Sequence, residues 1–297
     1  MATGRFAAFV ITYKRPDILP DTVNKLFQQT LPPEKVLIID NGDDEETMLK
    51  MTNFHPKVVY YRMGFNSGPA GGAKAGLDIL AKEGYKWIYW GDDNDPPPTD
   101  DCFEKLIALA ESYNGKCGQV GIVGHRFNRF TSVFHRTSNK ELRKSEYIKV
   151  DSIGGNQCKI INGLAVNKGV FPEERLFFGF EDLDFDLALK KAGYEILVHS
   201  ELFLTSRKIY GRMNVQRIIG RKKKPTSLWR DYYSIRNMPH IMLKNGYYIG
   251  FVSSIFIAVI KTFISFRHGF SYGNKVSAYN FRALRDFALS RYNQTVR

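Results

Sequence analysis

Cysteine is scarce in this chain: its 297 residues contain only three, Cys102, Cys117 and Cys158. This odd, widely spaced set provides neither the disulfide framework of a small secreted domain nor the close spacing of a zinc site. The opening segment MATGRFAAFVITYKRP also lacks a long apolar run behind a basic start, so we expect no signal peptide. Both absences predict a cytoplasmic protein.

Internal repeats and low-complexity tracts are also missing, and 43% hydrophobic with 25% charged residues excludes a disordered chain. The length is near the upper limit of one hydrophobic core, so we expect a catalytic domain over residues 1–206 and an appended basic helical segment over 207–297. The net charge of +13 predicts an anionic partner, such as nucleotide phosphates, nucleic acid or an anionic membrane.

Short apolar runs alternate with stretches of helical periodicity in the first third of the chain. The runs are rich in β-branched and aromatic residues and end in polar turns, which predicts an α/β fold with a Rossmann-like, mostly parallel sheet flanked by helices. Ligands bind such sheets at the carboxyl ends of the strands. The candidate site residues therefore follow the runs at 6–13, 36–40, 58–62 and 86–90.

An acidic motif, Gly91-Asp92-Asp93-Asn94-Asp95, directly follows the last of these strands and precedes three prolines. Its three carboxylates repel one another unless a cation neutralises them. Mg²⁺ and Mn²⁺ take carboxylate oxygens and bridge them to substrate phosphates, which predicts a metal site here. The alternative is a solvated acidic turn.

A second acidic pair, Glu181-Asp182, opens a predicted helix and has aromatic residues on both sides. Aromatic walls reduce solvation and raise the pKa of a carboxyl group, which suits a general base. Alternatively, these acids only complement the dipole of the helix.

Two further segments are typical of ligand sites. Asp40 and Asn41 end a buried strand, where a carboxylate can bind a nucleobase or ribose, or else cap a helix. The second is the Gly-rich turn that runs from Asn66 through Gly71 and Gly72. Its glycines allow a ligand to approach the backbone closely, and its free amides lie at the N-terminus of a predicted helix.

Together these motifs resemble glycosyltransferase family 2, inverting enzymes with the glycosyltransferase A-type fold, and most closely its rhamnosyltransferase and galactofuranosyltransferase branch. The resemblance runs from Phe9 to about Asn237. The segments that carry it are FVITYKRPDIL, VLIIDNGD, GFNSGPAGGAKAGL, GDDND, LFFGFEDLDFDLALKKAGYEI and WRDYYSIRN.

The resemblance implies a role for each motif. Asp40 would hold the base of a UDP- or dTDP-sugar, Asp93 with Asp92 or Asp95 would bind Mn²⁺ or Mg²⁺, and Asp182, beside Glu181, would deprotonate an acceptor hydroxyl. The reaction implied is a single in-line displacement with inversion, in which the metal stabilises the leaving diphosphate. The donor contacts it implies are Thr12, Tyr13, Arg15, Asn41, Asn66, Gly71, Gly72, Asp92, Arg230 and Arg236.

This chain departs from the family pattern at two places. Gly91 stands where relatives often have a third Asp, so the pair of carboxylates that touches the metal stays open. Relatives often supply a histidine beyond the base, and this chain has Ser206 at that register. His199 is the nearby candidate to join Asp93 and Asp95, or else a structural histidine at a strand end.

The C-terminal segment predicts a membrane contact. Residues 207–245 contain many bases and one acid, Asp231, and residues 249–266 are apolar except for Lys261 and a few hydroxyl side chains. An interfacial helix on an anionic membrane fits this pattern, which places the protein on the inner face of the cell membrane. The alternative is a helix packed in the core.

The function predicted first is transfer of rhamnose or galactofuranose to a lipid-linked or cell-surface glycan. A nucleotidyltransferase on a similar sheet is the second candidate, and a non-enzymatic membrane- or nucleic-acid-binding module the third. Bases that do not interleave with strand aromatics argue against a nucleic-acid partner. The sequence does not identify the sugar or the acceptor. It also leaves the oligomeric state open, and a homo-oligomer is one option.

Overall fold

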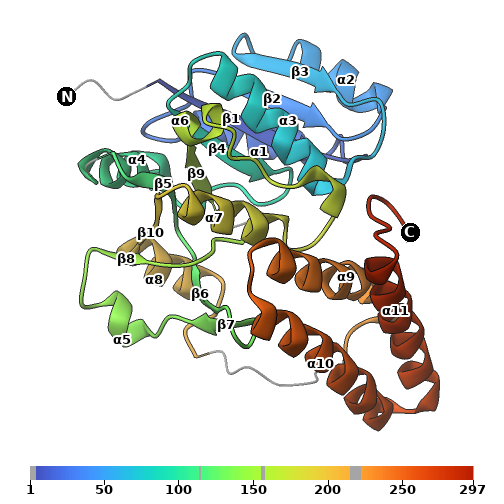
Figure 1. The fold of residues 1–297 in the computed structure, drawn as a ribbon. Coiled ribbons are helices and arrows are strands. Elements are labelled where there is room, and N and C mark those ends of the chain that lie inside the picture. The colour runs from blue at the N-terminus through green and yellow to red at the C-terminus, as the bar shows by residue number, and fades with distance from the viewer. Residues whose placement is uncertain (1–4, 114, 155–157, 215–221, 297) are drawn as a thin grey trace.

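The computed structural model describes residues 5–113, 115–154, 158–214 and 222–296. An eight-stranded sheet in the order β3-β2-β1-β4-β9-β5-β10-β8 runs through the molecule (Figure 1). The first four strands are parallel, and β9 lies antiparallel between β4 and β5. The strands are β1 Phe6–Thr12, β2 Val36–Asp40, β3 Val58–Arg62, β4 Trp87–Asp92, β5 Cys117–Gly121, β8 Tyr147–Lys149, β9 Lys159–Asn162 and β10 Glu195–His199, with a separate hairpin of β6 His125–Asn128 and β7 Val133–Arg136.

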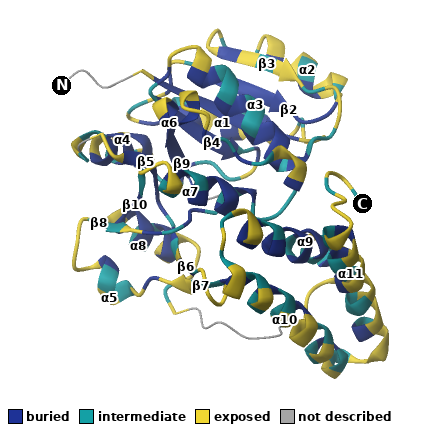
Figure 2. Ribbon diagram, viewed as in Figure 1, coloured by how far each residue is buried: buried dark blue, intermediate teal, exposed yellow. Residues whose placement is uncertain are grey.

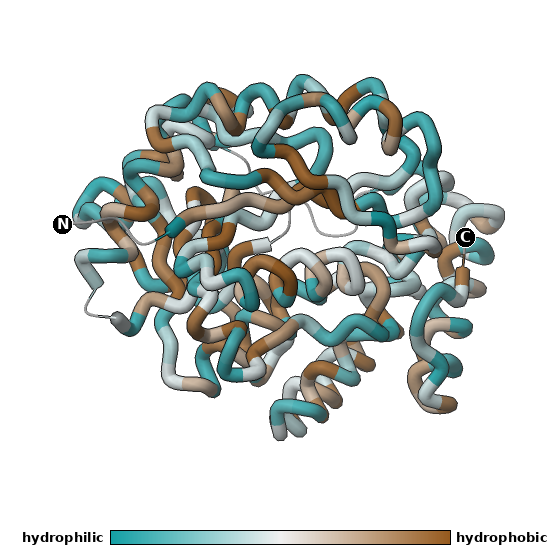
Figure 3. The backbone as a smooth tube through the Cα atoms, turned by 90° about the horizontal axis from the view of Figure 1, so that it is seen from above, coloured by the Kyte–Doolittle hydropathy of each residue, from teal (hydrophilic) through white to brown (hydrophobic). Residues whose placement is uncertain are grey.

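The predicted α/β fold is confirmed, because helices cover both faces of this sheet. All residues of β1 and β2 are buried, as their continuous apolar runs require. Alternate residues of β1 point to opposite faces: Ala8 and Val10 pack in one hydrophobic cluster, Ala7 and Phe9 in the other. Buried strands form the centre in Figure 2, and hydrophobic segments lie inside the hydrophilic outer turns in Figure 3.

Local sequence signals start several of the helices. The Asp44 side chain caps α2 by accepting a hydrogen bond from the Thr47 amide at 3.3 Å, and Ser138 and Glu141 form a capping box at α5. The helices are α1 Leu19–Phe27, α2 Glu45–Thr52, α3 Gly68–Lys82, α4 Cys102–Ser112, α5 Asn139–Leu142, α6 Gly163–Asn167, α7 Glu181–Lys191, α8 Ser200–Ile209, α9 Leu228–Lys244, α10 Tyr248–Ser265 and α11 Phe270–Ala288, with 3₁₀ turns at Glu174–Leu176, Pro225–Ser227 and Phe266–His268.

The C-terminal helices α9, α10 and α11 pack on one another beside the sheet (Figure 1). The boundary expected after residue 206 falls inside α8, which continues to Ile209. Part of the basic stretch, residues 215–221, lies outside the described residues. Helix α9 contacts the loop before α7, so the C-terminal helices also build part of the candidate site.

Candidate active site

A cleft of about 1090 Å³ opens at the carboxyl ends of β1 and β4. The loop before α3, the loop before α7, the start of α9 and the C-terminal tail form its remaining walls. Its size suits a ligand as large as a nucleotide-sugar. The cleft brings together these predicted residues: Thr12, Tyr13, Arg15, Asn41, Asn66, Asp92, Asp93, Glu181, Asp182 and Arg230.

Side chains from the end of β1, the loop after it and α1 hold Asp93 in place. Its carboxylate accepts hydrogen bonds from Thr12 Oγ1 at 3.0 Å and from Arg15 Nη1 at 3.1 Å, while Thr22 Oγ1 donates to its backbone carbonyl at 2.6 Å. Asp93 is buried, so these contacts fix its orientation. Both carboxylate oxygens are engaged, and Asp93 connects the loop after β1 to the loop after β4.

Asp92 lies near the acids at the start of α7 as well as near Asp93. Burial, together with the charges of Asp93 and Asp182, raises its pKa to about 7. Burial and the Asp182 charge likewise raise the pKa of the neighbouring Glu181 to about 8. Three carboxyl groups therefore share a small, poorly solvated volume, where negative charge is unfavourable unless a cation is present.

Lys159 is the cation that the structure places among these acids. It comes from β9, is 1% exposed, and forms an ion pair with Asp182. Its ammonium lies 3.6 Å from the ring centroid of Trp90, and its charge also acts on Asp92 and Asp186. Our sequence analysis missed Lys159, although a lysine directly before two isoleucines in the short strand KIIN was a usable signal.

Asp95 and His199 do not line this cleft, although the charge of Asp95 still contributes to the raised pKa of Asp92. Asp95 lines a separate hollow of about 280 Å³ with Ser206, Tyr210 and Arg212. Burial raises the pKa of Asp95 to about 6, although the positive charge of Arg212 lowers it. His199 ends β10, which is separated from β4 by two strands, and its ring caps α8. The structure therefore does not bring Asp93, Asp95 and His199 together.

The acids around Lys159 still fit a divalent cation. Within the described residues no three His, Cys, Asp or Glu side chains form a complete metal site. Glu181 Oε2 is nevertheless buried without a hydrogen-bond partner, next to Asp92 and Asp182. Mg²⁺ and Mn²⁺ are commonly held by one or two carboxylates plus substrate phosphates, and this cluster can supply such ligands.

Asp40 is a buried hydrogen-bond acceptor close to the Tyr13 ring. Its Oδ2 accepts hydrogen bonds from Tyr60 Oη at 2.6 Å and the Asp44 amide at 3.0 Å, while Oδ1 has no partner in the described chain. A Cβ at Gly42 would lie 3.2 Å from the Tyr13 ring and 3.5 Å from Asp40 Oδ1. The ring and the free oxygen are therefore neighbours, and glycine keeps the space between them open.

The Gly-rich turn contributes less to the cleft than its sequence suggested. Gly68 lines the cleft and has a φ of +71°, and a Cβ there would come within 2.1 Å of the Phe177 carbonyl. Gly71 and Gly72 are buried, and a Cβ at either would meet Ser67 or Ile11. We therefore assign Gly72 to the packing of α3 on β1, and Gly71 to the close fit of Ser67 against the first turn of α3, rather than to ligand contact.

The loop before α7 has an uncommon backbone. Phe177, Gly179 and Phe180 all have positive φ, at 64°, 82° and 68°. For two bulky residues this conformation is strained, and surrounding contacts must stabilise it. Asn237 of α9 provides them, because its Nδ2 lies within hydrogen-bond distance of the carbonyls of Leu176, Phe178 and Gly179, at 3.1, 2.9 and 2.8 Å.

Arg236 belongs to the same support. It is fully buried and donates to the Leu176 carbonyl at 2.8 Å and to the Asn293 carbonyl at 3.0 Å. It therefore does not reach the cleft, which corrects the prediction that it contacts a donor. Arg230 and Trp229, one helical turn or more before it, do line the cleft.

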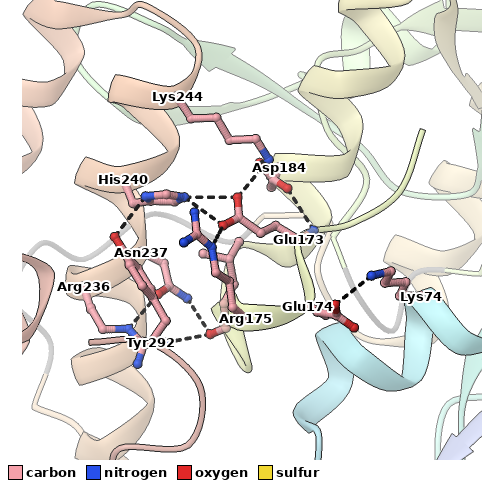
Figure 4. A network of polar contacts seen from close by, with 11 residues as sticks. Lys74, Glu173, Glu174, Arg175, Asp184, Arg236, Asn237, His240, Lys244 and Tyr292 are labelled. Carbon is pink, nitrogen blue, oxygen red and sulfur yellow. Dashed lines mark hydrogen bonds and ion pairs between the residues drawn. The ribbon is translucent and has the colours of Figure 1, made fainter. Parts of the chain in front are cut away.

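A network of charges holds α9 against the segment that precedes this loop (Figure 4). Glu173 lies at its centre, with His240 Nε2 at 3.0 Å and Lys244 Nζ at 2.9 Å from its carboxylate. Lys244 also pairs with Asp184 of α7 at 2.6 Å, and Tyr292 of the tail contacts His240 at 2.9 Å. The network joins α7, α9 and the tail into one unit.

Comparison with known proteins agrees with the motifs. Residues 7–167, more than half of the chain, match the family model for glycosyl transferase family 2. Galactofuranosyltransferase GlfT1 of Mycobacterium tuberculosis is 28% identical over 109 residues, which are 36% of this chain and 36% of that protein. GlfT1 of Mycolicibacterium smegmatis is 24% identical over 107 residues, which are 36% of this chain and 35% of that protein. The chain thus spans about a third of the length of these relatives.

A solved structure supports the fold. The crystal structure of GalNAc-T7 with UDP, GalNAc and Mn²⁺ matches with a TM-score of 0.54 and 13% identity, over 67% of this chain and 43% of that chain. At this identity the likeness concerns the fold alone, which is the glycosyltransferase A-type fold that we predicted.

Proposed function

Because the chain belongs to glycosyl transferase family 2, we propose that it transfers a sugar from a nucleoside diphosphate donor to a hydroxyl group of a glycan acceptor, with inversion at the anomeric carbon. The observation that carries this proposal is the position of Asp182 and Asp92 in one cleft with Tyr13, whose ring lies near the unpartnered oxygen of the buried Asp40. A nucleotide-sugar needs such parts in one cleft, namely a surface for the base and carboxylates near the diphosphate and the sugar.

The donor base would lie against Tyr13. Uracil and thymine both carry a ring N–H, which can donate a hydrogen bond to the unpartnered Asp40 Oδ1. Gly42 has no side chain that would fill the space between this oxygen and the Tyr13 ring. Arg15 and Arg230 line the cleft and provide positive charge for the phosphates. UDP- and dTDP-sugars are therefore the donors we favour.

A divalent cation, Mn²⁺ or Mg²⁺, would be held by Asp92 and Glu181 together with donor phosphates, which leaves Asp182 free to act on the acceptor. This assignment replaces Asp95 and His199, which lie elsewhere, and leaves Asp93 to join the two loops. When bound, the cation stabilises the negative charge of the departing diphosphate. The GalNAc-T7 structure that shares the fold contains Mn²⁺ and UDP, which is consistent with this proposal.

Asp182 would take the proton of the acceptor hydroxyl. It lines the cleft at the start of α7, where Lys159 neutralises its charge and orients its carboxylate. General-base assistance of this kind is worth roughly 10²–10⁴ in rate. Glu181, with its pKa raised to about 8, is mostly protonated at neutral pH until a cation binds and would serve as a secondary carboxylate.

The sugar is proposed from the relatives. Both relatives described above are named galactofuranosyltransferases, and the motifs resemble the branch that also transfers rhamnose. We therefore favour galactofuranose or rhamnose as the transferred sugar and a lipid-linked or cell-surface glycan as the acceptor.

The test is a donor screen with UDP- and dTDP-sugars, Mn²⁺ and short oligosaccharide acceptors. We expect release of a nucleoside diphosphate and a glycosylated product of inverted configuration. Asp182→Asn should reduce transfer by roughly 10²–10⁴ while UDP binding, measured by calorimetry, stays unchanged. The matched control is Asp17→Asn, because Asp17 is exposed outside the cleft. Release of pyrophosphate instead would indicate a nucleotidyltransferase, and an active Asp182→Asn variant would remove Asp182 as the base.

A further inference from the structure

The outward face of α10 carries large apolar side chains that no described part of the chain covers. Ile249, Val252, Phe256 and Phe263 are 64%, 63%, 63% and 73% exposed. Their spacing of three, four and seven residues places them on one stripe of the helix. Figure 2 shows this exposure along α10 and α11. The stripe is a continuous apolar surface rather than scattered single residues, and such surfaces mark interaction sites.

The opposite face of α10 contacts the protein through small residues. Gly250, Ser254 and Ala258 are buried, and a Cβ at Gly250 would come within 2.2 Å of the Arg129 carbonyl. Ser253 Oγ donates to the Phe130 carbonyl at 2.8 Å, which also fixes the first half of the helix. A helix packed in a core buries its large apolar side chains, whereas the residues that α10 buries fully are small and several of its large apolar residues are exposed. The core-packed alternative is therefore wrong.

The apolar surface continues onto α11 and has positive charge beside it. Phe270, at the start of α11, is 82% exposed. The nearby Tyr272 contacts two basic residues: Lys222 Nζ lies 5.5 Å from its ring centroid, and the Lys223 amide donates to its hydroxyl at 3.0 Å. Helix α10 contains no acid, and the single acid of α11, Asp286, is buried. Apolar side chains flanked by bases suit an anionic lipid surface.

We propose that the exposed stripe of α10 and the start of α11 form a membrane-docking surface, which enters one leaflet while Lys222, Lys224 and Lys275 contact anionic headgroups. The segment Tyr248–His268 is long and apolar enough to cross a bilayer by length and composition. However, its first half is fixed on residues 129–132, and α11 returns along it to α9. The hairpin therefore lies on the membrane rather than spanning it. This surface is independent of the proposed transfer reaction.

Co-sedimentation with vesicles of phosphatidylcholine, with and without phosphatidylglycerol, tests the proposal. The full chain should bind the anionic vesicles. The triple variant Ile249→Ser, Phe256→Ser, Phe263→Ser should bind at least tenfold more weakly, because three large apolar groups no longer enter the leaflet. The matched control replaces two exposed apolar residues of α2 and β3, Leu49→Ser with Val59→Ser, and should bind like the unchanged chain. Circular dichroism and thermal melting verify that all variants fold.

A second pair of variants tests the charge. Lys222→Ser with Lys224→Ser should reduce binding to anionic vesicles by about thirtyfold, at about 1 kcal/mol per base, and leave binding to neutral vesicles unchanged. Equal binding of the triple variant and the unchanged chain would overturn the proposal. So would light scattering that finds a dimer for the unchanged chain and a monomer for the triple variant, with no vesicle binding by either, because a second copy would then cover the surface.

Discussion

At the scale of single residues, Lys159 is the buried cation that faces several acids at the cleft. It pairs with Asp182, and its charge acts on Asp92 and on the fully buried Asp186, whose pKa burial raises to about 7. Removing one partner of a buried ion pair leaves the other charge without compensation, which costs more than the pair itself contributes.

Lys159→Ala should therefore lower both stability and activity. We expect a loss of about 3–5 kcal/mol in the free energy of unfolding, measured by urea denaturation, because Asp182 loses its partner inside the protein. Lys159→Arg keeps the charge and should retain more of both. A matched control is Lys168→Ala, since Lys168 is exposed at the end of α6. An Ala variant as stable and active as the unchanged chain would contradict the central position given to Lys159.

The carboxyl groups around Lys159 predict how stability depends on pH. Folding raises the pKa of Glu181 from 4.5 to about 8 and that of Asp92 from 3.8 to about 7. The folded chain thus binds more protons than the unfolded chain between about pH 4 and pH 8. These groups stabilise the fold at low pH, and their contribution is lost as the pH rises through 7 and 8.

Melting temperatures with and without Mn²⁺ and UDP check this prediction. Without the cation, stability should fall between pH 5.5 and pH 8. Mn²⁺ with UDP should raise the melting temperature more at pH 8 than at pH 5.5, because protons compete with the cation for the same oxygens. In Asp92→Asn the difference between the two pH values should shrink. An equal effect of Mn²⁺ at both pH values would count against a metal at these acids.

Sequence reasoning located the residues that directly follow strands and missed those that come from elsewhere. Asp92 ends β4, Asp93 and Asn41 directly follow β4 and β2, and parallel strands bring their carboxyl ends to one edge. Lys159 enters from β9, an antiparallel strand inserted between β4 and β5. No local pattern gives that insertion, because strand order depends on contacts between segments far apart in the chain.

At the scale of elements, α9 acts on the site mainly through the loop before α7. The WRDYYSIRN motif was singled out only by resemblance, and its buried members Arg236 and Asn237 hold the carbonyls of that loop. The sequence could not predict positive φ at Phe177 and Phe180, because phenylalanine rarely adopts it without outside support.

Asn237→Ala should therefore misplace Asp182 without touching the cleft. We expect kcat to fall about 10²-fold, as small displacements of catalytic groups do, with little change in affinity for UDP. Three carbonyls also lose a donor, which should cost about 1–3 kcal/mol of stability. Asn245→Ala is the matched control, because Asn245 only donates to the Ile241 carbonyl at the end of the same helix. A fall in UDP affinity with unchanged kcat would instead place Asn237 in donor binding.

At the scale of the whole molecule, one helical unit contains both the docking surface and a wall of the cleft. Helix α9 provides Trp229 and Arg230 to the cleft and packs against α10 and α11. The tail after α11 returns to the cleft at Gln294 and Val296, where the Tyr233 hydroxyl donates to the Val296 carbonyl at 2.8 Å. The sequence predicted the apolar, basic character of this region but not its contact with the cleft, which depends on that returning tail.

Docking at a membrane should therefore favour an acceptor that is anchored in it. We expect the chain to glycosylate a lipid-linked acceptor in anionic vesicles about 10²-fold faster than the same glycan free in solution at equal concentration, because confinement to one surface raises the effective concentration. The triple variant of α10 should lose this advantage and keep its rate on the free glycan, since none of its three changes lies in the cleft. If the variant lost activity on both acceptors, the α10 surface would be supporting the cleft itself. If it kept the advantage on vesicles, the acceptor would reach the cleft without help from the hairpin.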